Sequence, residues 1–165
     1  MNLVLAWLLA LGFVTVDDHC GNFPERRFDE SQSTKWKNRY TNLVYGYSVR
    51  IPMGRTGYSD LPPSPQHGFG LVLSWEPRAY LYVDGSYNSL EIKQAKELEQ
   101  LHLKWLAEEA TQVIGIEKHN VRLGSLRARR YVARYTCKKQ PGTFIEDEAL
   151  LLHKGIVYTV GFSIA

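Results

Sequence analysis

The chain has 165 residues, of which 44% are hydrophobic and 22% are charged, values that are ordinary for one soluble globular domain. Its 20 basic and 17 acidic side chains leave a net charge of +3, an excess too small to indicate a nucleic-acid-binding protein. At this length a core can form without a metal or several disulfides, so a scaffold that depends on such cross-links is excluded.

The chain starts with an apolar run from Leu3 to Val14, followed by Asp17. The run has the length of an export signal, whereas a membrane-spanning helix needs about 20 such residues. We therefore expect residues 1–16 to be an export signal, the protein to be periplasmic or extracellular, and no stable membrane span. Because the run has no Lys or Arg before it, a buried first strand or helix is the other interpretation.

The sequence contains two cysteines, Cys20 and Cys137. In an oxidising compartment a single pair allows one connectivity, so we expect a disulfide between them. Such a bridge would tie the N-terminal segment to a strand more than a hundred residues later. Two unpaired buried thiols are the alternative.

Residues 17–38 are polar and show no periodicity, which predicts an extended leader before a single domain at 39–165. Alternation from Leu43 to Ile51 then predicts a half-buried strand with a largely aromatic inner face. Residues 52–68 contain four prolines and three glycines and are predicted to be a long loop. Long loops are often functional, so Tyr58 and His67 are candidate binding residues, although a plain surface excursion is equally compatible with the pattern.

The middle of the chain predicts a hairpin followed by one helix. Phe69 to Trp75 and Ala79 to Val83 alternate on either side of a turn, which is typical of two antiparallel strands. From Asn88 the apolar residues recur at steps of three or four, which predicts a helix of about five to six turns that ends near Ala110. Its predicted apolar stripe comprises Ile92, Ala95, Leu98, Leu101, Trp105 and Leu106.

The C-terminal part predicts strands. They are a short one at 113–116 and longer ones at 126–137, 144–153 and 156–164, with the last three forming a meander. Turn signals at Pro141-Gly142 and Lys154-Gly155 separate these last strands. The order of elements predicts an α+β fold in which one long α-helix packs against a curved antiparallel β-sheet.

Three segments together resemble the PsbP-like fold family over residues 40–162. They are YTNLVYGYSVRIPMG from Tyr40, LGSLRARRYVARYT from Leu123, and KGIVYTVGF from Lys154. The resemblance implies a helix that crosses a curved antiparallel sheet, and accessory, binding or assembly roles more often than catalysis. It supplies no site residues. The further helix with which family members usually end has no counterpart here, so one sheet face would be less covered unless the leader lies over it.

The sequence contains none of the usual catalytic motifs, and we expect no catalytic residue, no metal site and no cofactor. His67 has no second ligand group near it in sequence, so a loop histidine is favoured over a metal or substrate ligand. His102 lies beside the helix stripe and is expected to be a boundary residue. Two acid–base pairs stay open, Asp60 with His67 and Glu146 with Glu148, although strand carboxylates usually face solvent.

Basic residues gather along the predicted strand at 126–137, where Arg127 and Arg129 are candidates for gripping an acidic partner. Alternation places these two on one side of the sheet and Arg130 and Arg134 on the other. Glu146, Asp147 and Glu148 follow on the next strand, so cross-strand ion pairs are favoured over partner binding.

These observations predict an exported, noncatalytic binding or accessory protein that acts through contact with another protein. Exposed aromatic side chains on strands would favour such an interface. The other hypothesis is a small envelope hydrolase or ligand carrier centred on the proline-rich loop and His67.

Overall fold

The computed structural model describes residues 34–59, 68–138 and 141–165. Of these residues, 63% lie in strands and 12% in one helix. The elements in chain order are β1 (Thr34–Trp36), β2 (Arg39–Asn42), β3 (Tyr47–Arg50), β4 (Gly57–Ser59), β5 (Phe69–Trp75), β6 (Arg78–Tyr87), α1 (Ala95–Glu109), β7 (Ala110–Leu123), β8 (Leu126–Cys137), β9 (Thr143–His153) and β10 (Ile156–Ile164).

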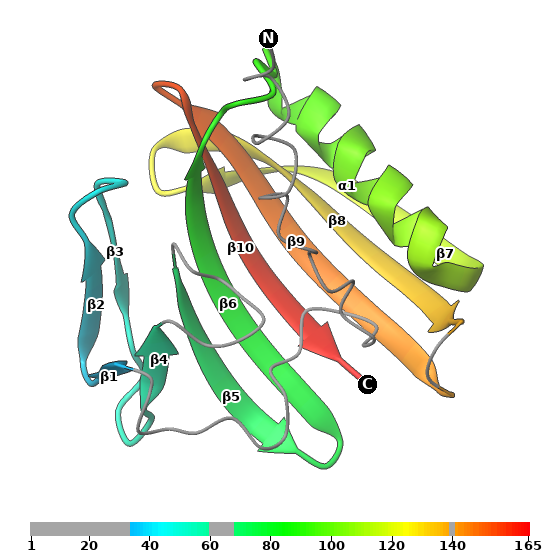
Figure 1. Ribbon diagram of the computed structural model, residues 1–165, viewed down its shortest axis with the longest axis horizontal. Helices are drawn as coiled ribbons and strands as arrows, with labels where there is room; N and C mark the ends of the chain where they lie inside the picture. Colours follow the sequence, from blue (N-terminus) through cyan, green and yellow to red (C-terminus); the bar gives the residue numbers. More distant parts are fainter. Residues whose placement is uncertain (1–33, 60–67, 139–140) are drawn as a thin grey trace, which may run out of the picture.

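Eight strands form one antiparallel sheet in the order β1-β4-β5-β6-β10-β9-β8-β7, and β2 pairs with β3 in a separate hairpin (Figure 1). The last four strands form a meander whose final strand, β10, pairs along its whole length with β6. The sheet is therefore continuous between the middle and the end of the chain, and β7 forms one of its edges.

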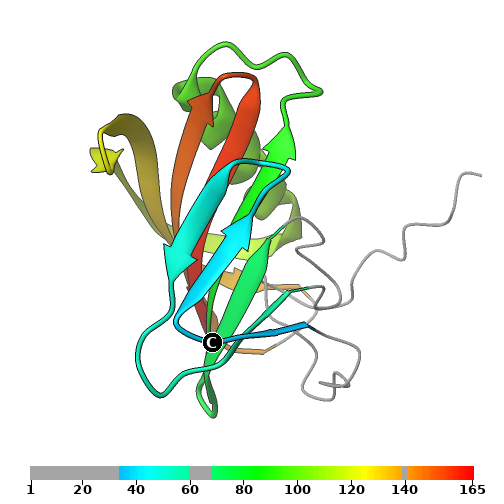
Figure 2. The same cartoon turned by 90° about the vertical axis from the view of Figure 1, so that its left-hand side faces the viewer.

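The two faces of the sheet are covered by different elements. On one face, α1 packs with Leu98, Leu103 and Leu106 against a core that includes Tyr131 and Tyr135 of β8. The other face carries the β2–β3 hairpin, and a smaller core forms there from the buried side chains of Tyr40, Ile51, Phe69 and Leu71. Figure 2 shows the hairpin in front, at the side of the sheet away from α1.

The expected α+β fold with one long helix packed on the sheet is wrong, because the structure is dominated by its sheet. The helix has 15 residues, about four turns, and begins at Ala95 instead of Asn88. The Asn88 side chain accepts a hydrogen bond from the N–H of Ile92 and donates one to its carbonyl. With Glu91 in the left-handed region, these bonds close a turn that holds residues 88–92 out of the helix.

Two predicted strands also differ from the structure. The strand expected from Leu43 to Ile51 is instead a turn followed by β3, because Gly46 has a positive φ and Asn42 accepts a hydrogen bond from the N–H of Tyr45. Leu43 is 88% exposed as a result. The strand expected at 113–116 is the 14-residue β7, a mostly exposed edge strand whose polar side chains do not alternate with apolar ones.

The hairpin and the C-terminal meander are confirmed. β5 pairs antiparallel with β6, and β8, β9 and β10 pair in succession. The turn between β9 and β10 places both Lys154 and Gly155 at positive φ. In the described ranges, no helix is long and apolar enough to cross a bilayer. The predicted export signal at 1–16 lies outside them, as does the part of the predicted leader before residue 34.

Candidate functional site

A buried polar cluster lies in the core under α1. The strand register sets Tyr82 of β6, Gly161 of β10, Glu148 of β9 and Tyr131 of β8 in one row across the sheet. Gly161 has no side chain, so the Tyr82 ring extends over β10 and its hydroxyl reaches Glu148. Glu146 lies two residues before Glu148 on the same face and completes the centre of the cluster.

Five hydrogen-bond contacts hold the two carboxylates of this cluster. The Tyr82 hydroxyl contacts both Glu148 and Glu146, at 3.1 Å from the latter. The Tyr131 hydroxyl contacts Glu148, and the Tyr135 hydroxyl lies 3.2 Å from Glu146. The fifth contact joins a histidine of α1 to Glu148 and so links the helix to the sheet.

His102 of α1 is the histidine at that contact. Its Nδ1 lies 2.8 Å from a Glu148 carboxylate oxygen, and its side chain is 18% exposed whereas that of Glu148 is 2% exposed. A carboxylate only accepts hydrogen bonds, so Nδ1 carries the hydrogen that joins the two groups. His102 therefore lies at the boundary of the core, as predicted, and in addition forms a hydrogen bond to the buried Glu148.

The two carboxylates differ in their proton affinity. Burial raises the pKa of Glu146 to about 8, with the nearby charge of Glu148 as the next cause. Burial also acts to raise the pKa of Glu148, but the hydrogen bonds from His102, Tyr131 and Tyr82 and the charge of His102 together outweigh it, and the pKa is lowered overall. The pKa values of the two carboxylates are therefore shifted in opposite directions.

The expectation that these strand carboxylates face solvent or form cross-strand ion pairs is wrong for Glu146 and Glu148. Both are buried, at 6% and 2% exposure, and their partners are tyrosines and a histidine. Along α1, the buried positions run from Leu98 to Leu106 at steps of one, three or four and include Glu99. A glutamate next to the apolar stripe of α1 was the sequence signal for buried polar contacts, whereas residues 144–151 place acidic and apolar side chains on both faces of the strand and gave no such signal.

The cluster does not offer a substrate site. The Glu146 and Glu148 side chains have almost no contact with solvent, so a reacting molecule could not approach them without displacement of α1. Glu146 and Glu148 are one of the two acid–base pairs considered from the sequence. They do lie close together, but at a buried position that a substrate does not reach.

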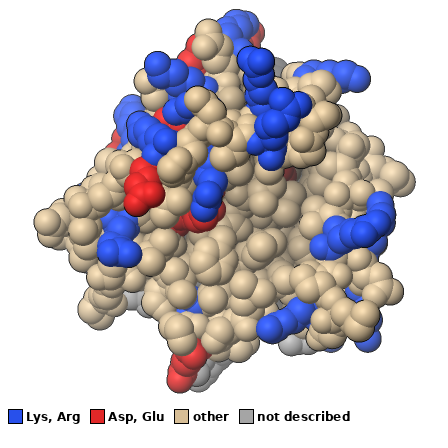
Figure 3. Space-filling view, turned by 180° about the vertical axis from the view of Figure 1, so that it is seen from behind, with Lys and Arg blue, Asp and Glu red and all other residues tan. Residues whose placement is uncertain are grey.

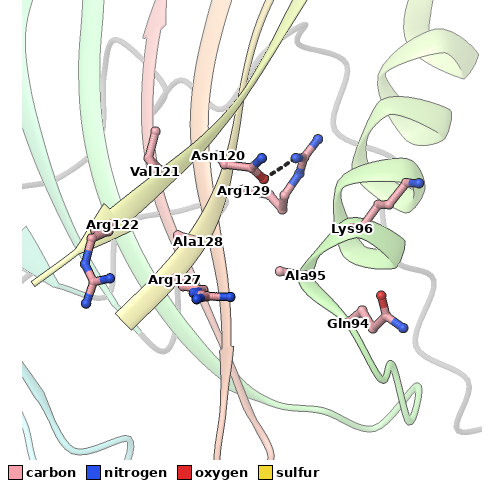
Figure 4. Close-up of a pocket in the computed structure, with 9 residues that line it drawn as sticks. All are labelled: Gln94, Ala95, Lys96, Asn120, Val121, Arg122, Arg127, Ala128 and Arg129. Atoms are coloured by element: carbon pink, nitrogen blue, oxygen red, sulfur yellow. Dashed lines mark hydrogen bonds between the residues drawn. The ribbon is translucent and has the colours of Figure 1, made fainter. Parts of the chain in front are cut away.

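A groove of about 690 Å³ lies at the surface between the start of α1 and the β7–β8 hairpin, and Figure 4 shows its lining. Both arginines singled out from the sequence line it. Arg127 and Arg129 extend from β8 toward α1, whereas Arg122 of β7 extends away from the helix. The other lining residues are Gln94, Ala95, Lys96, Asn120, Val121 and Ala128.

Arg129 is fixed by partners at the floor of this groove. Its Nε lies 2.7 Å from a carboxylate oxygen of Glu99, and its guanidinium also donates to the side chain of Asn120. Lys118 lies 3.4 Å from the other oxygen of Glu99, which is itself buried. The buried carboxylate of Glu99 thus orients both Arg129 and Lys118. Its negative charge offsets part of the positive charge that Arg129 presents to a ligand.

Arg127 is the arginine of this groove that no other described residue engages, and Lys96 of α1 is a second exposed cation in the lining. Arg127 is exposed and makes no hydrogen bond or ion pair with the described residues. Across the groove lies the start of α1, where Gln94 at the N-cap position forms no side-chain capping bond and Glu97 is the one acidic residue of the first turn. Helix starts carry partial positive charge, and none of the lining residues is acidic. The groove is therefore suited to a carboxylate or another anion.

The opposite side of β8 is arranged differently, as alternation predicted. Arg130 forms a bidentate ion pair with Asp147 of β9, at 2.6 and 2.7 Å, so one cross-strand pair is confirmed. Arg134 is exposed on that same face. Figure 3 shows that face from behind, with Lys and Arg gathered mainly toward its upper edge and an uncharged middle.

A second hollow of about 630 Å³ lies between the β2–β3 hairpin and the sheet. Its lining is mainly apolar and includes Val83, Leu126, Leu151, Tyr158 and Val160. The polar side chains at it are Ser48, Arg50 and His153, with no carboxylate. Nothing in this lining selects one class of ligand, so the basic groove is the more specific site.

The remaining predicted site residues do not join either place. Tyr58 lies on β4, half-buried against the main core, and pairs in register with Lys35. His67 lies outside the described residues, as do Asp60 and Cys20. Cys137 is buried at the end of β8, and because its predicted partner Cys20 lies outside the described residues, the disulfide between them stays a prediction. In the described part of the chain, no group of three or more His, Cys, Asp or Glu side chains is placed to hold a metal.

Comparison with known proteins finds no matching family model and no significantly similar curated protein. Among solved structures, the chain is similar to PA94 from Pseudomonas aeruginosa, a protein of unknown function, with 10% sequence identity and a TM-score of 0.43. The similarity covers 81% of this chain and 83% of that one. A similarity at this level assigns no function, and the resemblance to PsbP-like domains stays a prediction.

Proposed function

We propose that this chain is an exported, noncatalytic binding protein that acts through contact with another protein, and that its basic groove takes an acidic segment of that partner. The observation that carries the proposal is the exposed guanidinium of Arg127, which faces the uncapped start of α1 across the groove. A guanidinium fork and free backbone N–H groups are both good donors to carboxylates.

The arrangement of Arg129 supports the same proposal. Its bonds to Glu99 and Asn120 hold the side chain in place before any ligand arrives, so less side-chain entropy is lost on binding. Gln94 adds an amide at the rim. The groove therefore combines the fixed cation Arg129, the exposed cations Arg127 and Lys96, and a helix start, all on helices or strands.

The test is a charge reversal at Arg127 with a matched control on the same strand. Purified protein is titrated into a fluorescein-labelled oligoglutamate peptide, and binding is followed by fluorescence anisotropy. We expect Arg127→Glu to weaken binding by about tenfold or more, because a charged hydrogen bond is replaced by repulsion. Affinity of the unaltered protein should also fall as salt is added.

Arg134→Glu is the control, since it makes the same change on β8 but on the other face of the sheet. Its affinity should stay within about twofold of the unaltered protein. If both variants bound the peptide equally weakly, the loss of affinity would follow from net charge alone and the groove would not be the binding site. Absence of binding by the unaltered protein would also contradict the proposal. An oligolysine peptide checks the sign of charge and should not bind.

A further inference from the structure

We propose that the acidic partner segment binds as an added strand along the edge of β7, with an acidic side chain at every second position. This inference rests on the proposed function and specifies the form in which the partner segment is recognised. Three features of β7 carry it: its length as an edge strand, the different charges on its two faces, and its continuity with the basic groove.

β7 is an edge that can accept such a strand. Its register with β8 is shifted near Ala110 and Val113 but runs without a break from Gly115 to Leu123. No other described strand pairs with β7, and most of its residues are exposed. Every second residue of an antiparallel edge strand directs its N–H and carbonyl away from the sheet, so this stretch presents a row of main-chain groups to an added strand. The opposite edge, β1, has three residues and offers far fewer.

The two faces of β7 carry different charges. Lys118 and Arg122 belong by alternation to the face that carries α1, where Lys118 lies 3.4 Å from Glu99 and Arg122 lines the basic groove. On the other face, a carboxylate oxygen of Glu117 lies 3.6 Å from Nε2 of His119, and the Glu117 side chain is 77% exposed. An added strand therefore meets cations on one side and a carboxylate on the other.

This separation of charge selects an alternating segment. The side chains of an added strand point alternately to the two faces of the sheet, so acidic residues at every second position all lie on the side of Lys118 and Arg122. The residues between them lie on the side of Glu117 and are not repelled if they are neutral. A uniformly acidic strand would place half of its carboxylates on that side, where the charge of Glu117 opposes them.

The edge of β7 is continuous with the basic groove. Asn120 and Arg122 belong to both, and Asn120 accepts a hydrogen bond from Arg129 at the floor of the groove. Arg127 lies directly opposite Arg122 in the register of β7 with β8. A segment with one carboxylate at Arg127 can therefore continue along β7 toward Gly115.

A second copy of this chain fits the edge less well. Two copies related by a twofold axis would pair their β7 strands antiparallel with the same faces aligned. Lys118 and Arg122 of one copy would then lie on the same side as those of the other. Like charges next to each other across two strands are unfavourable, whereas an acidic segment neutralises them.

The experiment uses three fluorescein-labelled peptides of alternating glutamate and threonine, with binding followed by fluorescence anisotropy. The first peptide is unmodified, the second has N-methyl groups on its glutamates, and the third has them on its threonines. An added strand directs the N–H groups of one of these two sets toward β7 and those of the other set toward solvent. We expect one methylated peptide to bind about tenfold or more weakly than the unmodified one, and the other to stay within about twofold of it. Equal affinity of all three peptides, or equal losses in both methylated ones, would overturn the added strand.

Two variants of neighbouring residues test the face on which the acidic side chains lie. Lys118→Gln removes a cation from the α1 face and should weaken binding of the unmodified peptide by about threefold. Glu117→Gln makes a change of similar size on the opposite face and should not weaken it. Equal weakening by the two variants would contradict the assignment of the acidic residues to the α1 face.

Failure of the added strand differs from failure of the proposed function. If binding is weakened by Arg127→Glu but is the same for all three peptides, the basic groove stands and the added strand is wrong. If neither oligoglutamate nor the alternating peptide binds, both are wrong. If light scattering shows a dimer in which alternate amides of β7 are protected from hydrogen exchange, the edge belongs to a second copy and the proposal is overturned.

Discussion

Replacement of Glu148 with alanine is expected to lower the free energy of unfolding by about 3 to 5 kcal/mol, the loss typical of one partner removed from a buried charged network. Glu148 accepts hydrogen bonds from Tyr82, Tyr131 and His102, and its side chain is almost completely buried. Alanine would remove the acceptor of Tyr131 and His102, would leave Tyr82 with Glu146 as its acceptor, and would also open a cavity between α1 and the sheet. Thermal unfolding followed by circular dichroism should show a Tm lower by about 10 °C.

Two further variants separate this cause from a general effect of losing a glutamate. Glu117→Ala removes a carboxylate that is 77% exposed on β7 and should change the Tm by no more than about 2 °C. Glu148→Gln keeps the volume and part of the hydrogen bonding, so it should fall between the other two. A Glu148→Ala protein that melts with the unaltered one would show that the cluster does not stabilise the fold.

Replacement of Gly161 with alanine is expected to destabilise the protein by about 3 kcal/mol, at the upper end of what an overpacked core costs. A Cβ at this position would lie 2.1 Å from Cζ of Tyr82, far inside van der Waals contact. The Tyr82 ring cannot move away freely, because its hydroxyl is held by Glu146 and Glu148. Urea unfolding followed by tryptophan fluorescence measures the loss.

Gly115→Ala is the matched control, because Gly115 also lies within a strand but has no atom within 4 Å of the added Cβ. It should be neutral or slightly stabilising, since alanine reduces the freedom of the unfolded chain. Tyr82→Ala should make the Gly161→Ala change nearly harmless, so the two losses should not add. Additive losses would show that contact with Tyr82 is not the reason glycine is needed.

The sequence predicted the sheet well wherever apolar and polar residues alternate. β5, β8, β9 and β10 have nearly the expected spans, because apolar side chains recur along these strands, whereas β6 continues to Tyr87, beyond the end predicted at Val83. It was less successful where hydrogen bonds of side chains or an edge position decide the structure. Asn88 closes a turn in place of a first helical turn, and β7 is a strand because it pairs with β8 despite its polar surface.

For the sites, the sequence identified Arg127 and Arg129 by their place on one side of a strand, and the structure brings both to one groove. It could not show that Glu99 occupies Arg129 and leaves Arg127 available, because Glu99 lies on a helix thirty residues earlier in the chain. Tyr58 and His67 were selected by loop composition alone. Tyr58 packs on the core, away from the groove, and His67 lies outside the described residues.

The sequence by itself determined the strands β5, β8, β9 and β10 and on which side of β8 each arginine lies, because period-two alternation is a local property of the chain. Only the tertiary structure decided that Glu146 and Glu148 are buried together. Their burial depends on the contacts that Tyr82, across Gly161, and His102, from α1, make with Glu148. In the sequence, Tyr82 lies 66 positions from Glu148 and His102 lies 46 positions from it. A buried charge is tolerated only where distant partners satisfy it, and no local pattern specifies such partners.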